Sequence, residues 1–147
     1  MQLNNVMTTH VRGLATHQSV QEAAQVMSRL GVGAIPIFED GKPVGIVTDR
    51  DITIRSVANG REGSQQPLYE IMSQNLCLLP ETTPIKDAVH EMEHRQIRRV
   101  LVTGPDDEIV GIVSLGDIAA KSQQHRLSAE LIEKVSIPCL PLRELAE

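Results

Sequence analysis

The sequence predicts an α/β fold, a tandem pair of β-α-β-β-α repeats packed through their sheets with pseudo-twofold symmetry. The first observation is a phrase that occurs twice, GIVTDRDI at 45–52 and GIVSLGDI at 111–118. The second is that apolar positions recur in both halves of the chain at a nearly constant separation. The third is size, because 147 residues suit one domain or two small units that share a core. A single copy of about 50 residues is expected to bury too little apolar surface to fold alone.

The separation between the two copies changes by one residue along the chain. Met7 and Met72 are 65 residues apart, whereas Asp51 and Asp117 are 66 residues apart. The additional residue enters between FEDGKP and TGPDDEI, which are turn-rich segments where a hairpin can absorb it. Because the slip is confined to a loop, it indicates a duplicated structure.

Each copy is predicted to run strand, helix, strand, strand, helix. The first helix has apolar residues at helical spacing: Val20, Ala23, Ala24 and Met27. Ser19 and Glu22 form a capping-box signature ahead of it. The equivalent stripe in the second copy is Ile85, Ala88, Val89 and Met92. Thr83 is the predicted cap of that helix and Pro84 its first residue.

Short apolar runs bounded by turns predict the paired strands of each copy. They are AIPIF and VGIVT in the first copy, and RVLV and IVGIVS in the second. Their continuous apolar character favours strands that are buried on both faces.

The repeats also set the expected domain organisation. We expect a first repeat at 1–60, a polar linker and entry segment at 61–70, a second repeat at 71–122 and a helical tail at 123–147. The tail would place its apolar residues on one helical face: Leu127, Leu131, Ile132 and Val135. That face would cover the edge of the core or form a dimer contact.

Composition excludes several classes of function. The formal net charge is −5, and the chain has one Phe, one Tyr and no Trp, so neither a phosphate-neutralising face nor a base-stacking platform is indicated. Cys77 and Cys139 lie far apart and form neither a disulfide framework nor a thiolate metal cage. No apolar run approaches the length of about 18 residues that a membrane span needs. The start of the chain also lacks the features of a signal peptide. We therefore expect a cytoplasmic protein that binds neither nucleic acid nor membrane.

The repeated polar positions have two compatible interpretations. Thr48 with Asp51, and Ser114 with Asp117, stand where a strand gives way to a helix. In the structural interpretation each pair caps a helix, which is worth about 1 kcal/mol. In the functional interpretation the amides and the hydroxyl bind a phosphate, while the carboxylate accepts hydrogen bonds from the two vicinal hydroxyls of a ribose. The second interpretation predicts a site for a nucleoside phosphate.

Over residues 6–120 the duplicated pattern resembles a tandem pair of cystathionine β-synthase (CBS) repeats, from VMTT through GIVTDRDI and from IMSQ through GIVSLGDI. The resemblance implies a stand-alone, non-catalytic regulatory module, concerned with energy sensing, that binds AMP, ADP or ATP between the two repeats. NAD or S-adenosylmethionine are other ligands that it implies, and no cofactor is obligatory. It also implies a homodimer and an unidentified effector protein as partners.

The second copy is similar to repeats of the regulatory γ subunit of AMP-activated kinase, and this similarity implies roles for individual residues. Asp117 would hold the ribose, Ser114 and Arg99 would touch phosphate, and Arg98 would lie nearby. The rest of that site would be Ile112, Thr8, Arg12, Gly13, Val32, Gly33 and Ala34. The pseudo-symmetric site would use Thr48, Asp51, Ile46, Ser73, Cys77, Leu78, Ile97 and Arg98.

The two predicted sites differ in charge. Arg98 and Arg99 correspond, at a separation of 65, to Gly33 and Ala34. Because charge-assisted hydrogen bonds are roughly twice as strong as neutral ones, we expect the Asp117 site to bind phosphate more tightly. The alternative interpretation makes the two arginines an exposed surface pair.

Parts of the sequence are compatible with two other functions. HEMEH at 90–94 matches the zinc-protease motif, with His90 and His94 as ligands and Glu91 as base. In the repeat, however, both histidines align with positions off the apolar stripe, and no third ligand is indicated by spacing. We therefore predict no catalytic residue and no metal site, with a protein that binds metal through His90 and His94 as the minor alternative. A protein-interaction scaffold with non-functional pockets is the main alternative to a sensor.

Overall fold

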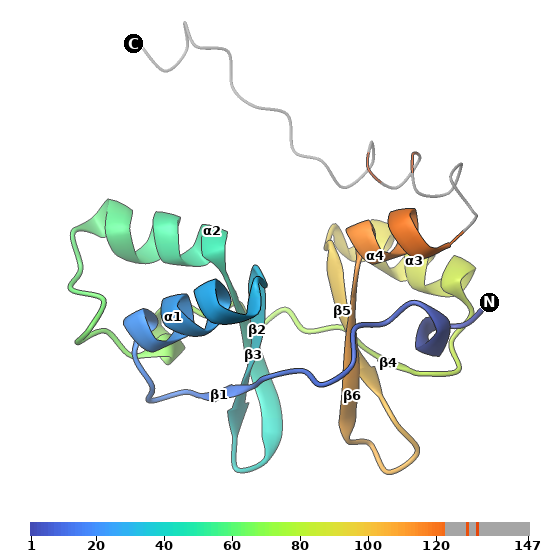
Figure 1. The fold of residues 1–147 in the computed structure, drawn as a ribbon, viewed down its shortest axis with the longest axis horizontal. Helices are drawn as coiled ribbons and strands as arrows, with labels where there is room; N and C mark the ends of the chain where they lie inside the picture. Colours follow the sequence, from blue (N-terminus) through green and yellow to red (C-terminus); the bar gives the residue numbers. More distant parts are fainter. Residues whose placement is uncertain (123–128, 130–131, 133–147) are drawn as a thin grey trace, which may run out of the picture. The chain divides into compact units, whose positions relative to one another are not determined.

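The structure, a computed structural model, describes residues 1–122 together with 129 and 132. The chain divides into two compact units (Figure 1). Unit 1 consists of Met1–Thr9 and Leu78–Glu147, and unit 2 consists of His10–Cys77. The predicted tail at 123–147 lies outside the described residues, apart from Ala129 and Ile132.

Unit 2 contains the first copy of the repeat. Its main elements are β1 (Leu14–Ala15), α1 (Val20–Leu30), β2 (Ala34–Glu39), β3 (Lys42–Thr48) and α2 (Asp49–Asp51). The chain continues from α2 into a π-helical turn, Ile52–Ser56, and then a 3-10 turn, Val57–Asn59. The sheet has the order β1-β2-β3, with β1 parallel and β3 antiparallel to β2.

Unit 1 contains the second copy with the same topology. Its elements are β4 (Leu78–Pro80), α3 (Ile85–Arg95), β5 (Arg99–Thr103), β6 (Ile109–Ser114) and α4 (Leu115–Lys121). The sheet order is β4-β5-β6, again with one parallel and one antiparallel pairing. The predicted order of strand, helix, strand, strand, helix is confirmed in both copies.

The one-residue slip between the copies falls in a hairpin turn, as predicted. In unit 2 the strands β2 and β3 are joined by Asp40 and Gly41, whose φ angles are 50° and 76°. Positive φ at both positions suits the twist of a two-residue hairpin, and glycine adopts it without steric cost. In unit 1 the connection between β5 and β6 is longer and runs from 104 to 108.

The helix predictions are confirmed in most details. Ser19 caps α1 by accepting a hydrogen bond from the Glu22 amide at 3.1 Å, and the Ser19 amide donates to the Glu22 carboxylate at 2.9 Å. The predicted stripe of α3 is buried throughout. In α1 the prediction for Ala24 is wrong, because the buried arc is Val20, Ala23, Val26 and Met27. Ala24 stands at the margin of that arc and is exposed.

The predicted start of α3 is wrong by one residue. Pro84 is the N-cap in an extended conformation, Ile85 is the first helical residue, and no side chain caps the helix. The Ile85 amide instead donates to the carbonyl oxygen of Met1 at 3.1 Å. A backbone segment distant in sequence thus satisfies a group that a local cap would otherwise have to satisfy.

The segment that precedes each copy packs on the other copy. We call 1–9 and 66–74 the leading segments; the first belongs to unit 1 and the second to unit 2. The Leu3 amide donates to the Thr83 carbonyl, and at the equivalent position the Leu68 amide donates to the Gln18 carbonyl. Leu3 and Leu68 are both fully buried. The leading segments are therefore part of the two cores.

The strands are less uniformly buried than predicted. The central residues of β2 and β5 are buried, in agreement with the prediction. In β3 and β6 buried and partly exposed residues alternate, so the prediction of burial on both faces is wrong for these two strands. The alternation indicates that one face of β3 and β6 packs on the core while the other face is partly open, because successive side chains of a strand point to opposite faces of the sheet.

Candidate functional site

The junction between β6 and α4 forms a closed capping box. The Asp117 amide donates to the Ser114 hydroxyl oxygen at 3.1 Å. In return, Asp117 Oδ2 accepts from the Ser114 amide at 2.8 Å and from the Ser114 hydroxyl at 2.7 Å. The structural interpretation of the Ser114 and Asp117 pair is therefore confirmed, and it commits one carboxylate oxygen.

The other carboxylate oxygen of Asp117 has a basic neighbour. Lys121 Nζ lies 3.2 Å from Asp117 Oδ1, one helical turn further along α4. Burial raises the pKa of Asp117, but the hydrogen bonds from Ser114 and the interaction with Lys121 together outweigh burial, so the net pKa is lowered. Asp117 is therefore an anion at neutral pH, with 20% of its side chain exposed.

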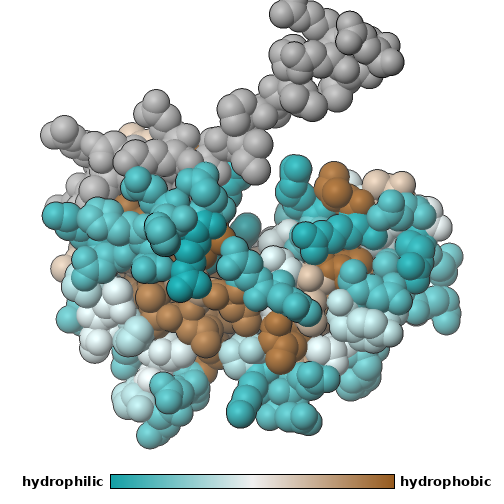
Figure 2. All heavy atoms as spheres, turned by 180° about the vertical axis from the view of Figure 1, so that it is seen from behind, coloured by the Kyte–Doolittle hydropathy of each residue, from teal (hydrophilic) through white to brown (hydrophobic). Residues whose placement is uncertain are grey.

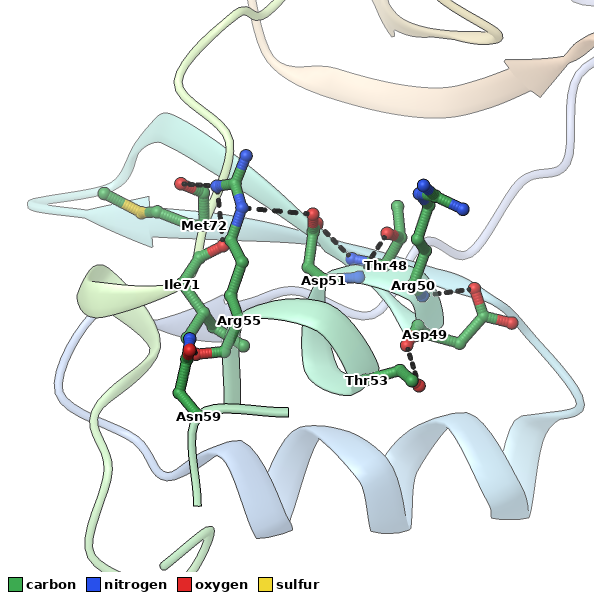
Figure 3. Close-up of polar contacts among 9 residues, drawn as sticks. All are labelled: Thr48, Asp49, Arg50, Asp51, Thr53, Arg55, Asn59, Ile71 and Met72. Atoms are coloured by element: carbon green, nitrogen blue, oxygen red, sulfur yellow. Dashed lines mark hydrogen bonds and ion pairs between the residues drawn. The ribbon is translucent and has the colours of Figure 1, made fainter. Parts of the chain in front are cut away.

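The junction between β3 and α2 repeats this arrangement in unit 2 (Figure 3). Thr48 Oγ1 accepts from the Asp51 amide at 3.1 Å, and Asp51 Oδ2 accepts from the Thr48 amide at 2.9 Å. Arg55 lies one turn further on, with Nε 3.9 Å from Asp51 Oδ1. Its Nη1 donates to the backbone carbonyls of Ile71 at 3.1 Å and Met72 at 3.3 Å. Figure 3 shows the Arg55 side chain between Asp51 and these carbonyls.

The strand that pairs with each junction carries different side chains in the two copies. In unit 1, Arg99 is directly opposite Ser114 in the β5–β6 ladder. In unit 2, the residue opposite Thr48 is Ala34. Because directly opposite residues project from the same face of a sheet, the Arg99 side chain starts beside the Ser114 hydroxyl. The charge asymmetry predicted from the sequence is thus a local feature of unit 1.

Each leading segment forms a short bridge with the strand before the junction. Thr8 and Ile112 exchange two backbone hydrogen bonds, at 2.9 and 3.1 Å. Ser73 and Ile46 do the same in unit 2, both at 2.9 Å. Four predicted site residues thus lie on the backbone next to the two capping boxes.

The structure places the predicted residues in two groups. Unit 1 contains Asp117, Ser114, Arg99, Arg98, Ile112, Thr8, Ile97 and Leu78. Unit 2 contains Asp51, Thr48, Ile46, Ser73, Cys77, Arg12, Gly13, Val32, Gly33 and Ala34. The core of each site, a hydroxyl, a carboxylate and a bridged leading segment, is brought together within one unit. The residues assigned to each site from the other unit stay a prediction.

Sequence reasoning missed Arg55 and Lys121. Both are basic, both follow a junction aspartate by four residues, and they are separated by the same 66 residues as Asp51 and Asp117. The i,i+4 spacing of an acid and a base on a helix is a visible signal. The repeated phrase ends one residue after each aspartate and therefore includes neither basic residue.

The zinc-protease motif has no confirming context in the described part of the chain. His90 and His94 are exposed on α3, as the repeat alignment predicted. Glu91, the would-be base, is paired with Arg95 at 2.9 Å. Among the described residues no group of three or more His, Cys, Asp or Glu side chains could hold a metal ion.

Two pseudo-equivalent α/β units, each with a carboxylate and a hydroxyl at a strand-to-helix junction, define the class of protein: a tandem-repeat module with paired polar sites. The chain belongs to the CBS domain family, whose model matches residues 3–57 and 68–123. The recognition made from the sequence is confirmed. In the described residues no helix combines the length and the apolar character that crossing a membrane demands.

Relatives of similar length support this assignment. The CBS domain-containing protein YhcV of Bacillus subtilis is 37% identical over 134 residues, which cover 91% of this chain and 94% of YhcV. Hypoxic Response Protein I, solved with two coordinated zinc ions, is 31% identical with a TM-score of 0.68, covering 81% of this chain and 97% of that one. The CBS domain pair of protein MJ0100, in complex with 5-methylthioadenosine and S-adenosyl-L-methionine, is 26% identical with a TM-score of 0.69. That match covers 81% of this chain and 93% of MJ0100.

Proposed function

We propose that this protein is a non-catalytic regulatory module whose two junction aspartates bind the ribose of adenosine-containing ligands, with AMP, ADP or ATP as the main ligands. The observation that carries the proposal is the equivalence of the two junctions. Each presents an Asp carboxylate that remains partly exposed, 15% at Asp51 and 20% at Asp117, after it has capped its own turn. A cap requires one oxygen, and the second oxygen, which lies beside Lys121 or Arg55, has a further lone pair for a ligand.

The carboxylate suits a ribose because it only accepts hydrogen bonds. An ionised Asp offers about four lone-pair positions, and the two vicinal hydroxyls of a ribose are donors. At Asp51, the described residues place one hydrogen bond on the carboxylate, from the Thr48 amide. At Asp117 they place two on Oδ2 and a lysine contact on Oδ1. Both junctions can accept a ribose hydroxyl, and Asp51 has more acceptor positions to spare.

The two junctions differ in charge and are therefore suited to different ligands. Arg99 beside Ser114 adds a guanidinium that can bind phosphate through charge-assisted hydrogen bonds. Unit 2 has Ala34 at the equivalent place and offers no such group there. We expect nucleotides to favour the Asp117 site and uncharged adenosyl compounds to favour the Asp51 site. The remaining residues predicted from the resemblance, such as Arg12 and Val32, would complete the two sites.

A regulatory module without a catalytic residue has to act through a partner protein. A ligand changes the partner only if it binds one arrangement of the module more tightly than another. Ile54 and Val57, on the turns after α2, are 51% and 67% exposed. Figure 2 shows apolar surface over this helical segment, at the upper right. This apolar pair supports self-association as a homodimer or contact with an effector protein.

A binding panel tests the proposed function. Isothermal titration of the full chain would use adenosine, AMP, 2′-deoxy-AMP, ATP, NAD, S-adenosylmethionine and Zn²⁺. We expect saturable binding of AMP and an affinity about tenfold lower for 2′-deoxy-AMP. In Asp117→Asn the ratio between these two affinities should be smaller, because the variant has already weakened the hydrogen bond to the ribose. Asp106→Asn, in an exposed turn, is the matched control. If no adenosyl compound bound, the scaffold alternative would replace the sensor.

A further inference from the structure

Lys121 contacts two groups that come from distant parts of the sequence. Its Nζ lies 3.2 Å from Asp117 Oδ1 and donates to the backbone carbonyl of Val6 at 3.0 Å. Val6 is fully buried in the leading segment of unit 1. A single ammonium group thus joins the junction carboxylate to a segment 115 residues away along the chain.

Arg55 makes the same connection in unit 2. It ion-pairs with Asp51 and donates to the carbonyls of Ile71 and Met72. Ile71 is equivalent to Val6 in the repeat, and it is fully buried in the other leading segment. Two different basic side chains, lysine and arginine, therefore perform one task at equivalent places. This recurrence argues against an accidental surface contact.

The carbonyls that are held in this way lie immediately before the bridges of the leading segments. Two residues after Val6, the backbone of Thr8 pairs with Ile112, and two residues after Ile71, the backbone of Ser73 pairs with Ile46. The chain then leaves the segment and enters the other unit within a few residues. Each junction carboxylate is thus connected, through one basic side chain, to the leading segment just before the chain passes into the other unit.

We propose that Lys121 and Arg55 are positioning residues that link occupancy of the junction carboxylate to the seating of the leading segment. The inference rests on the proposed function, because it assigns the ligand hydroxyl to the same carboxylate. A ligand hydroxyl that donates to Oδ1 fixes the orientation of the Asp carboxylate, and the carboxylate in turn restricts the basic side chain beside it. The basic side chain then loses less conformational entropy when it donates to the carbonyl of the leading segment than it would without ligand. Because coupling is reciprocal, a seated segment must in turn favour the ligand.

The link is stronger in unit 1. Lys121 lies within hydrogen-bonding distance of its carboxylate, whereas Arg55 Nε is 3.9 Å from Asp51. A charge interaction weakens with distance, and the Arg55 guanidinium is largely engaged by the two carbonyls. We therefore expect ligand binding at Asp117 to affect its leading segment more than ligand binding at Asp51 affects the other.

Amide hydrogen exchange measured by NMR on the full chain tests this proposal. The reporters in unit 1 are the amides of Thr8 and Ile112, which donate to each other's carbonyls. Without ligand, Lys121→Met should speed exchange at both by about two- to fivefold, the range for a partly exposed ion pair, and Lys121→Arg should restore it. The amides of Ser73 and Ile46 should not change. Lys86→Met, an exposed lysine on α3, is the matched control.

The ligand arm uses AMP as the probe. AMP should slow exchange at Thr8 and Ile112 in the unmodified chain and in Lys121→Arg, and this slowing should be absent in Lys121→Met. An equal effect of AMP in all three chains would overturn the coupling while leaving the proposed function intact. Unchanged amide exchange in ligand-free Lys121→Met would show that Lys121 does not hold the leading segment in place. If AMP bound to no variant, the proposed function would fail, and the ligand-free comparison would still decide whether Lys121 seats the segment.

Discussion

The side chain of Met7 lies directly against the backbone of Gly111. A Cβ atom built on Gly111 would lie 2.6 Å from Met7 Sδ, which is closer than van der Waals contact permits, and 3.1 Å from Met7 Cβ, which is a tight contact. Gly45 and Met72 stand in the same relation in unit 2, also at 2.6 Å. The glycine of the repeated phrase is therefore required by the leading segment that crosses its strand, and this contact places Thr8 and Ser73 beside the junctions.

This contact predicts that Gly111→Ala is destabilising. We expect a loss of about 1–3 kcal/mol in the free energy of unfolding, since a methyl group forced into a packed site displaces its neighbours. Urea unfolding measures the loss. Gly63→Ala is the matched control, because its Cβ would meet no atom closer than 3.8 Å, and it should be nearly neutral. Equal stability of the Gly111 and Gly63 variants would contradict the packing described.

The two main helices should respond differently to the loss of a hydroxyl at their start. Ser19→Ala removes a cap that accepts from the Glu22 amide and should cost about 1 kcal/mol in unfolding free energy. Thr83→Ala removes a side chain that caps nothing and should change stability by less than about 0.5 kcal/mol. Thermal or urea unfolding of the two variants under one condition gives the comparison. A larger loss for the Thr83 variant would show that α3 is capped as the sequence predicted.

Much of the fold could be predicted because the evidence was periodic and repeated. The apolar stripe of α3 and the slip in a turn follow from spacing alone. The start of α3 could not be predicted, because its first amide is satisfied by the Met1 carbonyl, a partner that no local pattern names. The packing of each leading segment on the other copy could not be predicted either. The repeat spacing would be the same if each segment packed on its own copy.

The candidate site was predictable where its residues share one short phrase. Ser114 and Asp117 were identified from the cap signature, and their mutual hydrogen bonds agree with it. Lys121 was missed, although its spacing from Asp117 was visible, because an i,i+4 pair has so common a structural explanation. Its contact with the Val6 carbonyl, which gives it a role, depends on the tertiary fold.

The lowered pKa of Asp117 predicts a particular dependence of stability on pH. The ordinary pKa of an Asp side chain is 3.8, and the folded chain lowers the pKa of Asp117 below it, so the unfolded chain binds the proton more readily than the folded one. The stabilisation by the ionised group is therefore complete above about pH 5 and is lost as the pH falls through the lower, folded pKa. Unfolding free energies of the unmodified chain and Asp117→Asn should differ at pH 7, and the difference should shrink as the pH falls below the ordinary pKa of an Asp side chain.

An exposed carboxylate supplies the control for this pH experiment. Asp106, in the turn between β5 and β6, is exposed and should give an Asn variant whose stability follows that of the unmodified chain at every pH. If the gap between the unmodified chain and Asp117→Asn stayed constant from pH 7 to pH 3, the charge of Asp117 would have no part in stability. The cap would then act through its hydrogen-bond geometry alone.

Arg99 provides the sharpest separation of phosphate binding from ribose binding. Because Arg99 is opposite Ser114 and Asp117 follows one turn later, the guanidinium and the carboxylate contact different parts of one ligand in the proposed site. Arg99→Ala should weaken AMP and ATP by more than about tenfold, the value of one desolvated charge-assisted contact, and leave adenosine unchanged. Asp117→Asn should weaken all three.

Titration calorimetry measures the three affinities, and Arg95→Ala, on the exposed face of α3, controls for the loss of net charge. An unchanged AMP affinity in Arg99→Ala would remove this residue from the site, and an equal loss for adenosine would show that it supports the fold instead of binding phosphate.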